Sequence, residues 1–134
     1  MSSIEVGIKL PEVVTEPLSR ATLALFAGAS GDHNPIHIDT DFARAAGYDD
    51  VFAHGMLSVA FLAQVVTNWV PQDRIRSLST RFLERTPVNA RLRCCGHVEK
   101  ISIVDGERRA QVALYVELED GTKTIAGAAV VALS

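Results

Sequence analysis

The sequence is poor in the features that mark secreted chains. It contains two cysteines in 134 residues, and because Cys94 and Cys95 are adjacent they cannot close a loop of the chain. The N-terminal segment MSSIEVGIKLPEV lacks the basic start, the apolar run and the small-residue cleavage site of a secretory signal. We therefore expect a reduced, cytoplasmic protein.

Long apolar runs and clustered positive charge are also missing. The main apolar run, Met56 to Val70, has 15 residues and includes four polar ones, whereas a membrane-spanning helix needs about 20 residues. The 13 Lys and Arg residues are scattered, and the formal net charge is −3. A protein that binds nucleic acid concentrates its positive charge on one surface. Neither a membrane nor a nucleic acid is therefore an expected partner.

The composition and the local patterns are typical of one α+β domain. Hydrophobic residues make up 48% of the chain, and a chain of this size buries roughly two-thirds of its unfolded surface without disulfides or a structural metal. We therefore take residues 1–134 as a single domain. Capping residues, glycines and apolar spacing predict three helices, at residues 19–30, 39–47 and 55–70.

After Pro71 the pattern changes to alternating apolar and polar residues. Four β-rich segments follow, at residues 75–88, 90–104, 108–119 and 124–134. Asp105-Gly106 and Asp120-Gly121 suit the positive φ angles of tight hairpins, so they join the last three segments into an antiparallel meander. The last segment is almost entirely apolar and is expected to be buried on both faces. The prediction is an α+β fold in which a curved antiparallel sheet wraps the long helix, with sheet edges that a dimer can cover.

Polar residues that can carry out chemistry gather between the first and the last of the predicted helices. Three of the four histidines lie there, with several aspartates and an asparagine. Asp32 and His37 are five residues apart across the Asn34-Pro35 turn, so they can approach one small molecule from two sides. A carboxylate and an imidazole together can hold a water, take one proton from it and return another, and the Asn34 amide can orient that water. Asp, Asn and Pro are also common turn residues, so this segment read alone is more often a loop than a site.

The start of the long helix, His54-Gly55, is a second candidate. The free N–H groups and the dipole of a helix start suit a negative charge that develops on oxygen. Gly55 has no side chain to keep a ligand carbonyl away from its N–H, although it can equally serve only to ease a tight turn. His33 is expected to be exposed, and Asp39 to cap the second helix.

Other kinds of site have less support in the sequence. His33 and His37 are four residues apart, but Pro35 between them breaks the helical geometry that would put them on one face, so no metal is predicted. The chain has no GxSxG motif, no nucleophile pattern around its cysteines, and neither a phosphate loop nor GxGxxG.

Read together, these elements resemble the signature of the MaoC-like, hydratase 2 family of (R)-specific enoyl-thioester hydratases and dehydratases. The signature is an aromatic residue and then G-D-x-N-P-[LIV]-H-x5-[AS]. The chain supplies Phe26 and then residues 31–43, with every specified position matched, and HGM at residues 54–56 is the second element. The likeness extends from EVG at residues 5–7 to the small-residue final strand, and so covers nearly the whole chain.

This resemblance implies the hotdog fold and dimers that pair through their sheets, with the acyl thioester at or near the interface. It implies that Asp32 and His37 are the catalytic pair, that Asn34 places the water, and that the Gly55 N–H receives the thioester oxygen. The implied reaction is the reversible hydration of a trans-2-enoyl thioester to the (R)-3-hydroxyacyl product. No metal is implied, and no cofactor beyond the carrier of the acyl group, CoA or acyl-carrier protein.

Several alternatives stay open at this stage. The helix ending TNWVP and the RF…PV pattern of residues 81–88 resemble dehydratase subunits of actinobacterial fatty-acid elongation, which act on acyl-carrier protein beside a non-catalytic partner. The chain is then the catalytic subunit of a heterodimer rather than a homodimeric enzyme acting on acyl-CoA. A non-catalytic acyl-thioester-binding module and a thioesterase are further alternatives, and the complete motif argues against both.

One position departs from the family pattern. Some short-chain hydratases carry a serine near Ala63 in the long helix, and alanine cannot donate that hydrogen bond, so the acyl pocket is expected to differ.

The candidates to bind CoA phosphates, which the sequence does not rank, are Arg81, Arg85, Arg91 and Arg93. Acyl chain length, carrier, pathway and the member of the catalytic pair that takes the first proton are also left open.

Overall fold

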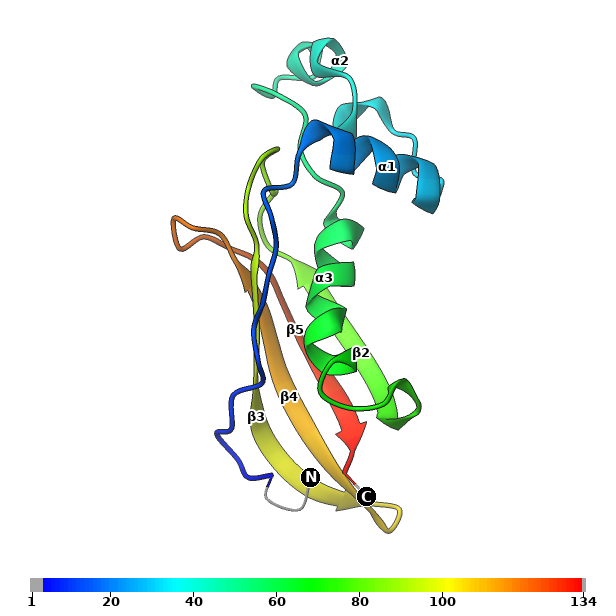
Figure 1. Ribbon diagram of the computed structural model, residues 1–134, viewed down its shortest axis with the longest axis vertical. Coiled ribbons are helices and arrows are strands. Elements are labelled where there is room, and N and C mark those ends of the chain that lie inside the picture. Colours follow the sequence, from blue (N-terminus) through cyan, green and yellow to red (C-terminus); the bar gives the residue numbers. More distant parts are fainter. Residues whose placement is uncertain (1–3, 134) are drawn as a thin grey trace.

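The computed structural model describes residues 4–133, and in this part of the chain a helix lies along the face of a single curved antiparallel sheet (Figure 1). Its five strands lie in the order β1-β3-β4-β5-β2. The strands are β1 (Val13–Val14), β2 (Ile75–Phe82), β3 (Arg93–Val104), β4 (Glu107–Glu117) and β5 (Lys123–Ala132). The helices are α1 (Arg20–Ser30), α2 (Thr40–Ala45) and α3 (Gly55–Thr67), with the 3₁₀ helices η1 (Pro35–His37) and η2 (Gln72–Arg74). The predicted α+β class and the sheet wrapped around the long helix are confirmed.

The meander of β3, β4 and β5 is confirmed, with one turn of the predicted kind and one longer loop. Asp105 and Gly106 both have positive φ, 52° and 77°, and form the tight β3–β4 turn. At the β4–β5 connection only Gly121 has a positive φ, 88°. There the Asp120 carboxylate accepts a hydrogen bond from the Thr122 N–H (2.9 Å), which folds residues 118–122 into a wider loop.

The first predicted strand is shorter than expected, because β2 ends at Phe82 rather than near residue 88. The N–H of Leu83 still bonds to the Thr124 carbonyl (2.8 Å), but the chain then crosses to the other edge of the sheet, where β3 begins. On the way, the Thr86 carbonyl accepts a hydrogen bond from the Ala53 N–H (2.9 Å). This crossing places residues 84–86 beside the segment that leads into α3.

The prediction that the last strand is buried on both faces is wrong for the single chain. The residues of β5 that face α3 are buried, but Ala126, Gly127, Ala128 and Val130 are only half-buried. The reason is that the outer face of the sheet has no second layer over it within the described residues. Ser134, at the end of the predicted segment, lies outside them.

Helix α3 supplies one side of the core. Its buried residues are Leu57, Ser58, Val59, Leu62, Val65 and Val66. Gly96 on β3 allows the helix to approach the sheet closely, because a Cβ at this position would lie 2.9 Å from Leu114 Cδ2 and 3.3 Å from Val65 Cγ1. This close packing therefore fixes the C-terminal part of α3 against the sheet.

Helices α1 and α2 stand beyond the end of the sheet, at the end of the molecule where α3 begins (Figure 1). Ser19 caps α1 by accepting a hydrogen bond from the Thr22 N–H (3.2 Å). Asp39 caps α2 through the N–H groups of Asp41 (3.0 Å) and Phe42 (3.2 Å). Both caps were predicted. The segment that carries Asp32 and His37 lies between Gly31, which ends α1 with a φ of 77°, and the Asp39 cap of α2.

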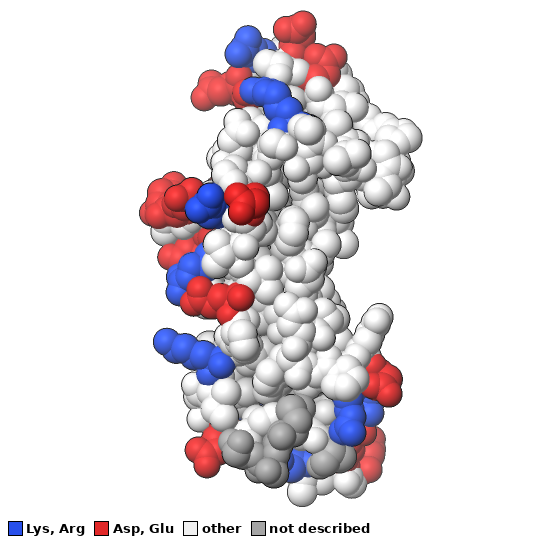
Figure 2. All heavy atoms as spheres, in the orientation of Figure 1, with Lys and Arg blue, Asp and Glu red and all other residues white. Residues whose placement is uncertain are grey.

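Charge is unevenly distributed over the surface. Figure 2 shows charged side chains along the side where the N-terminal segment and β3 run and at both ends, while the middle of this face, over α3, carries none. The edge strand β2 exposes two large apolar side chains, Leu78 at 41% and Phe82 at 60%. Across residues 4–133 we find no helix with the length and apolar character needed to cross a membrane.

Candidate active site

The segment between α1 and α2 folds through the side chains that the sequence singled out. The Asp32 carboxylate accepts a hydrogen bond from the backbone N–H of Asn34 (3.2 Å), and the Asn34 side-chain oxygen accepts one from the N–H of Ile36 (3.1 Å). Pro35 begins η1, where a missing N–H costs nothing because the first residues of a helical turn have no intrahelical acceptor. Since the Asn34 oxygen is engaged, its NH₂ group is left to donate to a ligand.

His37 is half-buried at the end of η1 and is held by the backbone of another segment. Its Nδ1 lies 2.7 Å from the Phe52 carbonyl oxygen, which can only accept. Nδ1 therefore carries the proton, and Nε2 of the neutral ring keeps a lone pair. The Phe52 ring packs edge-on against the imidazole, with 5.2 Å between centroids. This arrangement leaves Nε2 as the atom of His37 that can accept a proton.

His54 belongs to the same cluster, although the sequence indicated it only as the residue that opens α3. It is 2% exposed, and its Nε2–H donates to the backbone carbonyl of Asp32 (3.1 Å). Its ring stacks on that of His37, with 3.9 Å between centroids and 27° between planes, and Phe26 packs edge-on against it, with 5.0 Å between centroids. His54 thus ties the Asp32 backbone and the His37 ring to the start of α3.

The structure brings Asp32 and His37 together, as their spacing predicted. A carboxylate oxygen of Asp32 and a ring nitrogen of each of His37 and His54 lie within 4.8 Å of one another. A single water bridges such a gap with two hydrogen bonds of about 2.8 Å. We call Asp32 and His37 the acid–imidazole pair. Asp32 and Asn34 are exposed, so a molecule in solution can reach the pair in this chain.

The same three residues are also a possible set of metal ligands. The hydrogen bonds do not exclude this use, because a metal-binding histidine commonly donates its other ring N–H to a backbone carbonyl, as His37 Nδ1–H and His54 Nε2–H do here. The ring nitrogens left without a proton are then His37 Nε2 and the buried His54 Nδ1, which with the exposed Asp32 carboxylate make three protein ligands, the lower end of what a zinc site uses. That the site works without a metal stays a prediction.

Gly55 is the first residue of α3, so its N–H has no acceptor within the helix. It lines a cavity of about 340 Å³, together with Ser58 on the next turn and the side chains of Phe52, Phe82 and Ile125 among others. The cavity is mostly apolar, which suits an acyl chain better than a charged ligand.

Neither Asp32 nor His37 is among the residues that line this cavity. Two connections nevertheless place the acid–imidazole pair at its margin. Phe52 lines the cavity and bonds to His37 through its carbonyl, and Gly55 lines it and directly follows His54.

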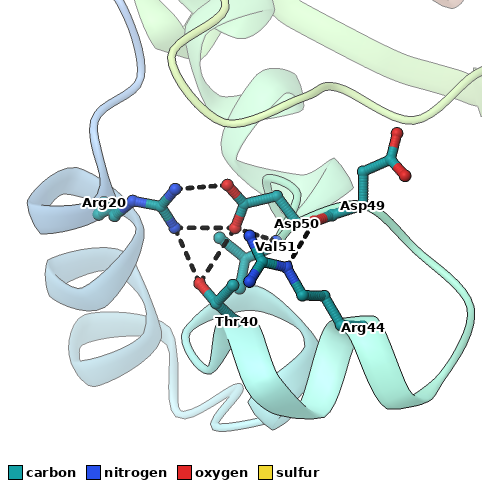
Figure 3. A network of polar contacts seen from close by, with 6 residues as sticks. All are labelled: Arg20, Thr40, Arg44, Asp49, Asp50 and Val51. Carbon is teal, nitrogen blue, oxygen red and sulfur yellow. Dashed lines mark hydrogen bonds and ion pairs between the residues drawn. The ribbon is translucent and has the colours of Figure 1, made fainter.

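A polar network holds the three segments around the site together (Figure 3). The Arg20 guanidinium of α1 forms two hydrogen bonds to the Asp50 carboxylate, which also accepts from the Thr40 hydroxyl (3.0 Å) and the Val51 N–H (2.8 Å). From α2, the Arg44 Nε–H donates to the Asp49 carbonyl (3.1 Å). The network thus anchors the segment that presents the Phe52 carbonyl and His54.

We expect Asp50→Asn to lower Tm by several degrees at neutral pH, and the difference from wild type to shrink in acid. Hydrogen bonds from Arg20 and Val51 hold the pKa of Asp50 well below its usual value of 3.8. A carboxyl with a lowered folded-state pKa stabilises the fold at neutral pH, and this stabilisation is lost as the pH falls below the unfolded-state value. Asparagine has the same shape but does not titrate.

Thermal unfolding of both proteins from pH 7 down to pH 2.5 measures this difference. A gap in Tm that stays constant across the range would show that the charge of Asp50 does not contribute. Glu107 contributes a parallel acid dependence in both proteins, because Arg76 and Arg109 lower its pKa to about 2, so only the difference between the two proteins is informative.

A helix wrapped by a curved antiparallel sheet defines a hotdog-fold protein, and Asp32 and His37 come together beside His54, the residue that precedes the helix. Residues 4–121 match the MaoC like domain, so the chain belongs to this family. The resemblance predicted from the sequence motif is therefore confirmed.

Relatives of similar length carry the names of hydratases or dehydratases, which are hydro-lyases. The chain is 26% identical to an (R)-specific enoyl-CoA hydratase of Aeromonas caviae over 131 residues, which is 98% of this chain and 96% of the relative. It is 26% identical to the 3-hydroxyacyl-thioester dehydratase Z of Mycobacterium tuberculosis over 113 residues, 79% of this chain and 75% of the relative. The solved R-hydratase of Pseudomonas aeruginosa in its unliganded form superposes with a TM-score of 0.83 at 27% identity, covering 98% of this chain and 83% of that one.

Other curated relatives are much longer proteins. The chain spans only 6%, 27% and 11% of the lengths of three of these relatives.

Proposed function

We propose that the chain is an (R)-specific enoyl-thioester hydratase, which adds water reversibly to trans-2-enoyl-CoA and forms (R)-3-hydroxyacyl-CoA. The observation that carries the proposal is the convergence of the Asp32 carboxylate with the His37 ring, whose tautomer leaves Nε2 able to accept a proton. A sensor that only binds thioesters has no use for this pair, and the related chains of similar length are named hydratases and dehydratases.

In the proposed reaction, Asp32 and His37 hold one water between them, and the Asn34 NH₂ group orients it. The pair accepts one proton as the water oxygen attacks C3, and it delivers one proton to C2 on the same face. The C2–C3 π bond is thereby replaced by a C3–O and a C2–H bond. Because the two groups share the proton, they act as one coupled unit.

The electron pair that leaves C3 collects on the thioester oxygen as an enolate. The Gly55 N–H at the start of α3 donates to this oxygen, and the positive end of the helix dipole adds to the stabilisation. Removing one donor of this kind typically reduces kcat by about 10²–10³. No cofactor takes part beyond the carrier of the acyl group.

Arg85 is the arginine best placed to bind a phosphate of that carrier. Arg93 is paired with Glu12 and Glu117, and Arg91 lies 3.9 Å from Glu16. Arg85 forms no ion pair with the described residues, stacks over the Tyr48 ring at 4.6 Å, and lines the same cavity as Gly55.

We expect Arg85→Ala to raise the KM for crotonyl-CoA about tenfold with little change in kcat, because a charge-assisted bond to phosphate contributes to binding in the ground and transition states alike. The increase should shrink at high salt. Steady-state kinetics at two ionic strengths measure it, with Arg81→Ala as the control for removing a nearby positive charge. An unchanged KM in Arg85→Ala, or an equal change in both variants, would refute the assignment.

The proposed reaction is tested by following the loss of enoyl-thioester absorbance when purified protein is mixed with crotonyl-CoA. Turnover with formation of the (R)-3-hydroxy product supports it. Absence of turnover from folded protein, on crotonyl-CoA and on longer enoyl chains, would contradict it.

The second candidate is the catalytic subunit of a heterodimeric 3-hydroxyacyl-acyl-carrier-protein dehydratase, the same reaction in reverse on another carrier. The exposed apolar side chains on edge strand β2 favour pairing with a second sheet, from another copy or from a related subunit. Sizing of the chain expressed alone separates the two: a stable homodimer favours the hydratase, and aggregation favours the heterodimer.

The free thiols of Cys94 and Cys95 fit the cytoplasm, the compartment predicted from the sequence.

A further inference from the structure

Three side-chain polar atoms in the described part of the chain are buried without a hydrogen-bond partner. They are His54 Nδ1, Ser58 Oγ and Thr124 Oγ1. Burying an unpaired hydroxyl destabilises a fold, so a hydroxyl kept in such a place needs an explanation. Ser58 is 1% exposed and stands in the first turns of the longest helix, where alanine would fill almost the same space at no such cost.

Ser58 lies where the helix start meets the cavity. It lines the cavity of about 340 Å³ together with Gly55. Residues three apart share one side of a helix, so the Ser58 side chain and the Gly55 N–H face the same region. Most of the other lining side chains near them are apolar, including Phe52, Phe82 and Ile125.

The usual structural use of a helical serine does not apply to Ser58. Serine hydroxyls inside helices commonly donate to the carbonyl four residues earlier, which here is that of His54. That carbonyl instead accepts from the Leu57 N–H (3.1 Å), and the Ser58 hydroxyl makes no bond to it. The proton of the hydroxyl is therefore available to a molecule that enters the cavity.

We propose that Ser58 is a further substrate-binding residue, whose hydroxyl donates a hydrogen bond to the carbonyl oxygen of the acyl thioester. The inference rests on the proposed function, which brings this oxygen to the Gly55 N–H. A carbonyl oxygen has two lone pairs and can accept from both donors. The thioester is the only polar group of a short enoyl chain, so it is the part of that ligand that needs a polar partner in an apolar cavity.

The test compares Ser58→Ala with Thr124→Val, which removes the other buried, unpaired hydroxyl. Thr124 is 1% exposed and does not line the cavity. Both variants are expected to raise Tm, by about 3 °C, because each removes an unsatisfied buried group. Only Ser58→Ala should weaken binding of butyryl-CoA, a saturated thioester that cannot react, by about tenfold, and lower kcat/KM for crotonyl-CoA by a similar factor.

Ser58→Cys separates the hydrogen bond from the shape of the pocket. Cysteine keeps nearly the same volume but is a weak donor, so it should bind butyryl-CoA about as weakly as the alanine variant does. Wild-type affinity for butyryl-CoA in Ser58→Ala would overturn the inference, and so would an equal loss in Thr124→Val. Calorimetry with butyryl-CoA needs no turnover, so a wild type that binds but does not react would refute the proposed hydration and leave the role of Ser58 standing.

Discussion

Replacement of Asp32 by asparagine, or of His37 by alanine, is expected to reduce turnover of crotonyl-CoA by about a hundredfold or more. Asparagine retains the side-chain oxygen that accepts the Asn34 N–H, so the turn stays folded while the group that takes up a proton is lost. His37 is half-buried, and its side chain makes one hydrogen bond, to the Phe52 carbonyl. Asp32→Asn should therefore unfold close to the wild-type Tm. His37→Ala also loses the packing of its ring against His54 and Phe52, so it should unfold at a somewhat lower Tm, and in both variants the loss of activity should appear in kcat.

The double variant sharpens this prediction. If one water is shared by both groups, removing either group already removes the activation of that water. Asp32→Asn combined with His37→Ala should then be little slower than the slower single variant, as expected for residues that act as a unit. Losses that multiply would show that the two residues act independently, and turnover that is indifferent to both would contradict the assigned site.

Much of the fold and of the site could be predicted because the signals are local. Alternating apolar residues in β4 and capping side chains at Ser19 and Asp39 act within a few residues of themselves. The segment from Asp32 to His37 likewise folds through Asx turns between near neighbours. These interactions join residues that are close together in the sequence, so they can be predicted from a short stretch of it.

Contacts between distant segments could not be predicted in the same way. His54 bonds to a backbone carbonyl 22 residues earlier, and Arg20 pairs with Asp50 across 30 residues. A sequence shows that these side chains need partners, but not which atoms the fold brings to them. The half-exposed side of β5 has a similar origin, since an apolar strand does not reveal whether a second layer lies over both of its faces.

Ser58 is another residue whose surroundings could not be predicted from the sequence. In the sequence, Ser58 is one of the four polar residues in the apolar run from Met56 to Val70. There it indicates only that this run is not a membrane-spanning helix. Its burial, its lack of a partner and its place beside Gly55 become visible only when α3 is set against the sheet.

Gly55→Ala is expected to lower kcat/KM for crotonyl-CoA by about a hundredfold while changing Tm little. Gly55 does not have a positive φ, so alanine fits the backbone there. Its Cβ would lie 2.7 Å from Phe82 Cε1, but Phe82 is 60% exposed at the end of β2, and its ring can turn away at small cost. The methyl group would still stand beside the N–H that the thioester oxygen has to approach.

The close contact offers a second reason for glycine at this position, namely to make room for the Phe82 ring. Phe82→Ala removes that ring, and so separates the two explanations when it is combined with Gly55→Ala. If glycine is needed for the approach of the substrate, the double variant should remain about a hundredfold less active than Phe82→Ala alone. Activity equal to that of Phe82→Ala would mean that glycine at this position only makes room for the Phe82 ring, and that a methyl group beside the N–H does not hinder the thioester oxygen.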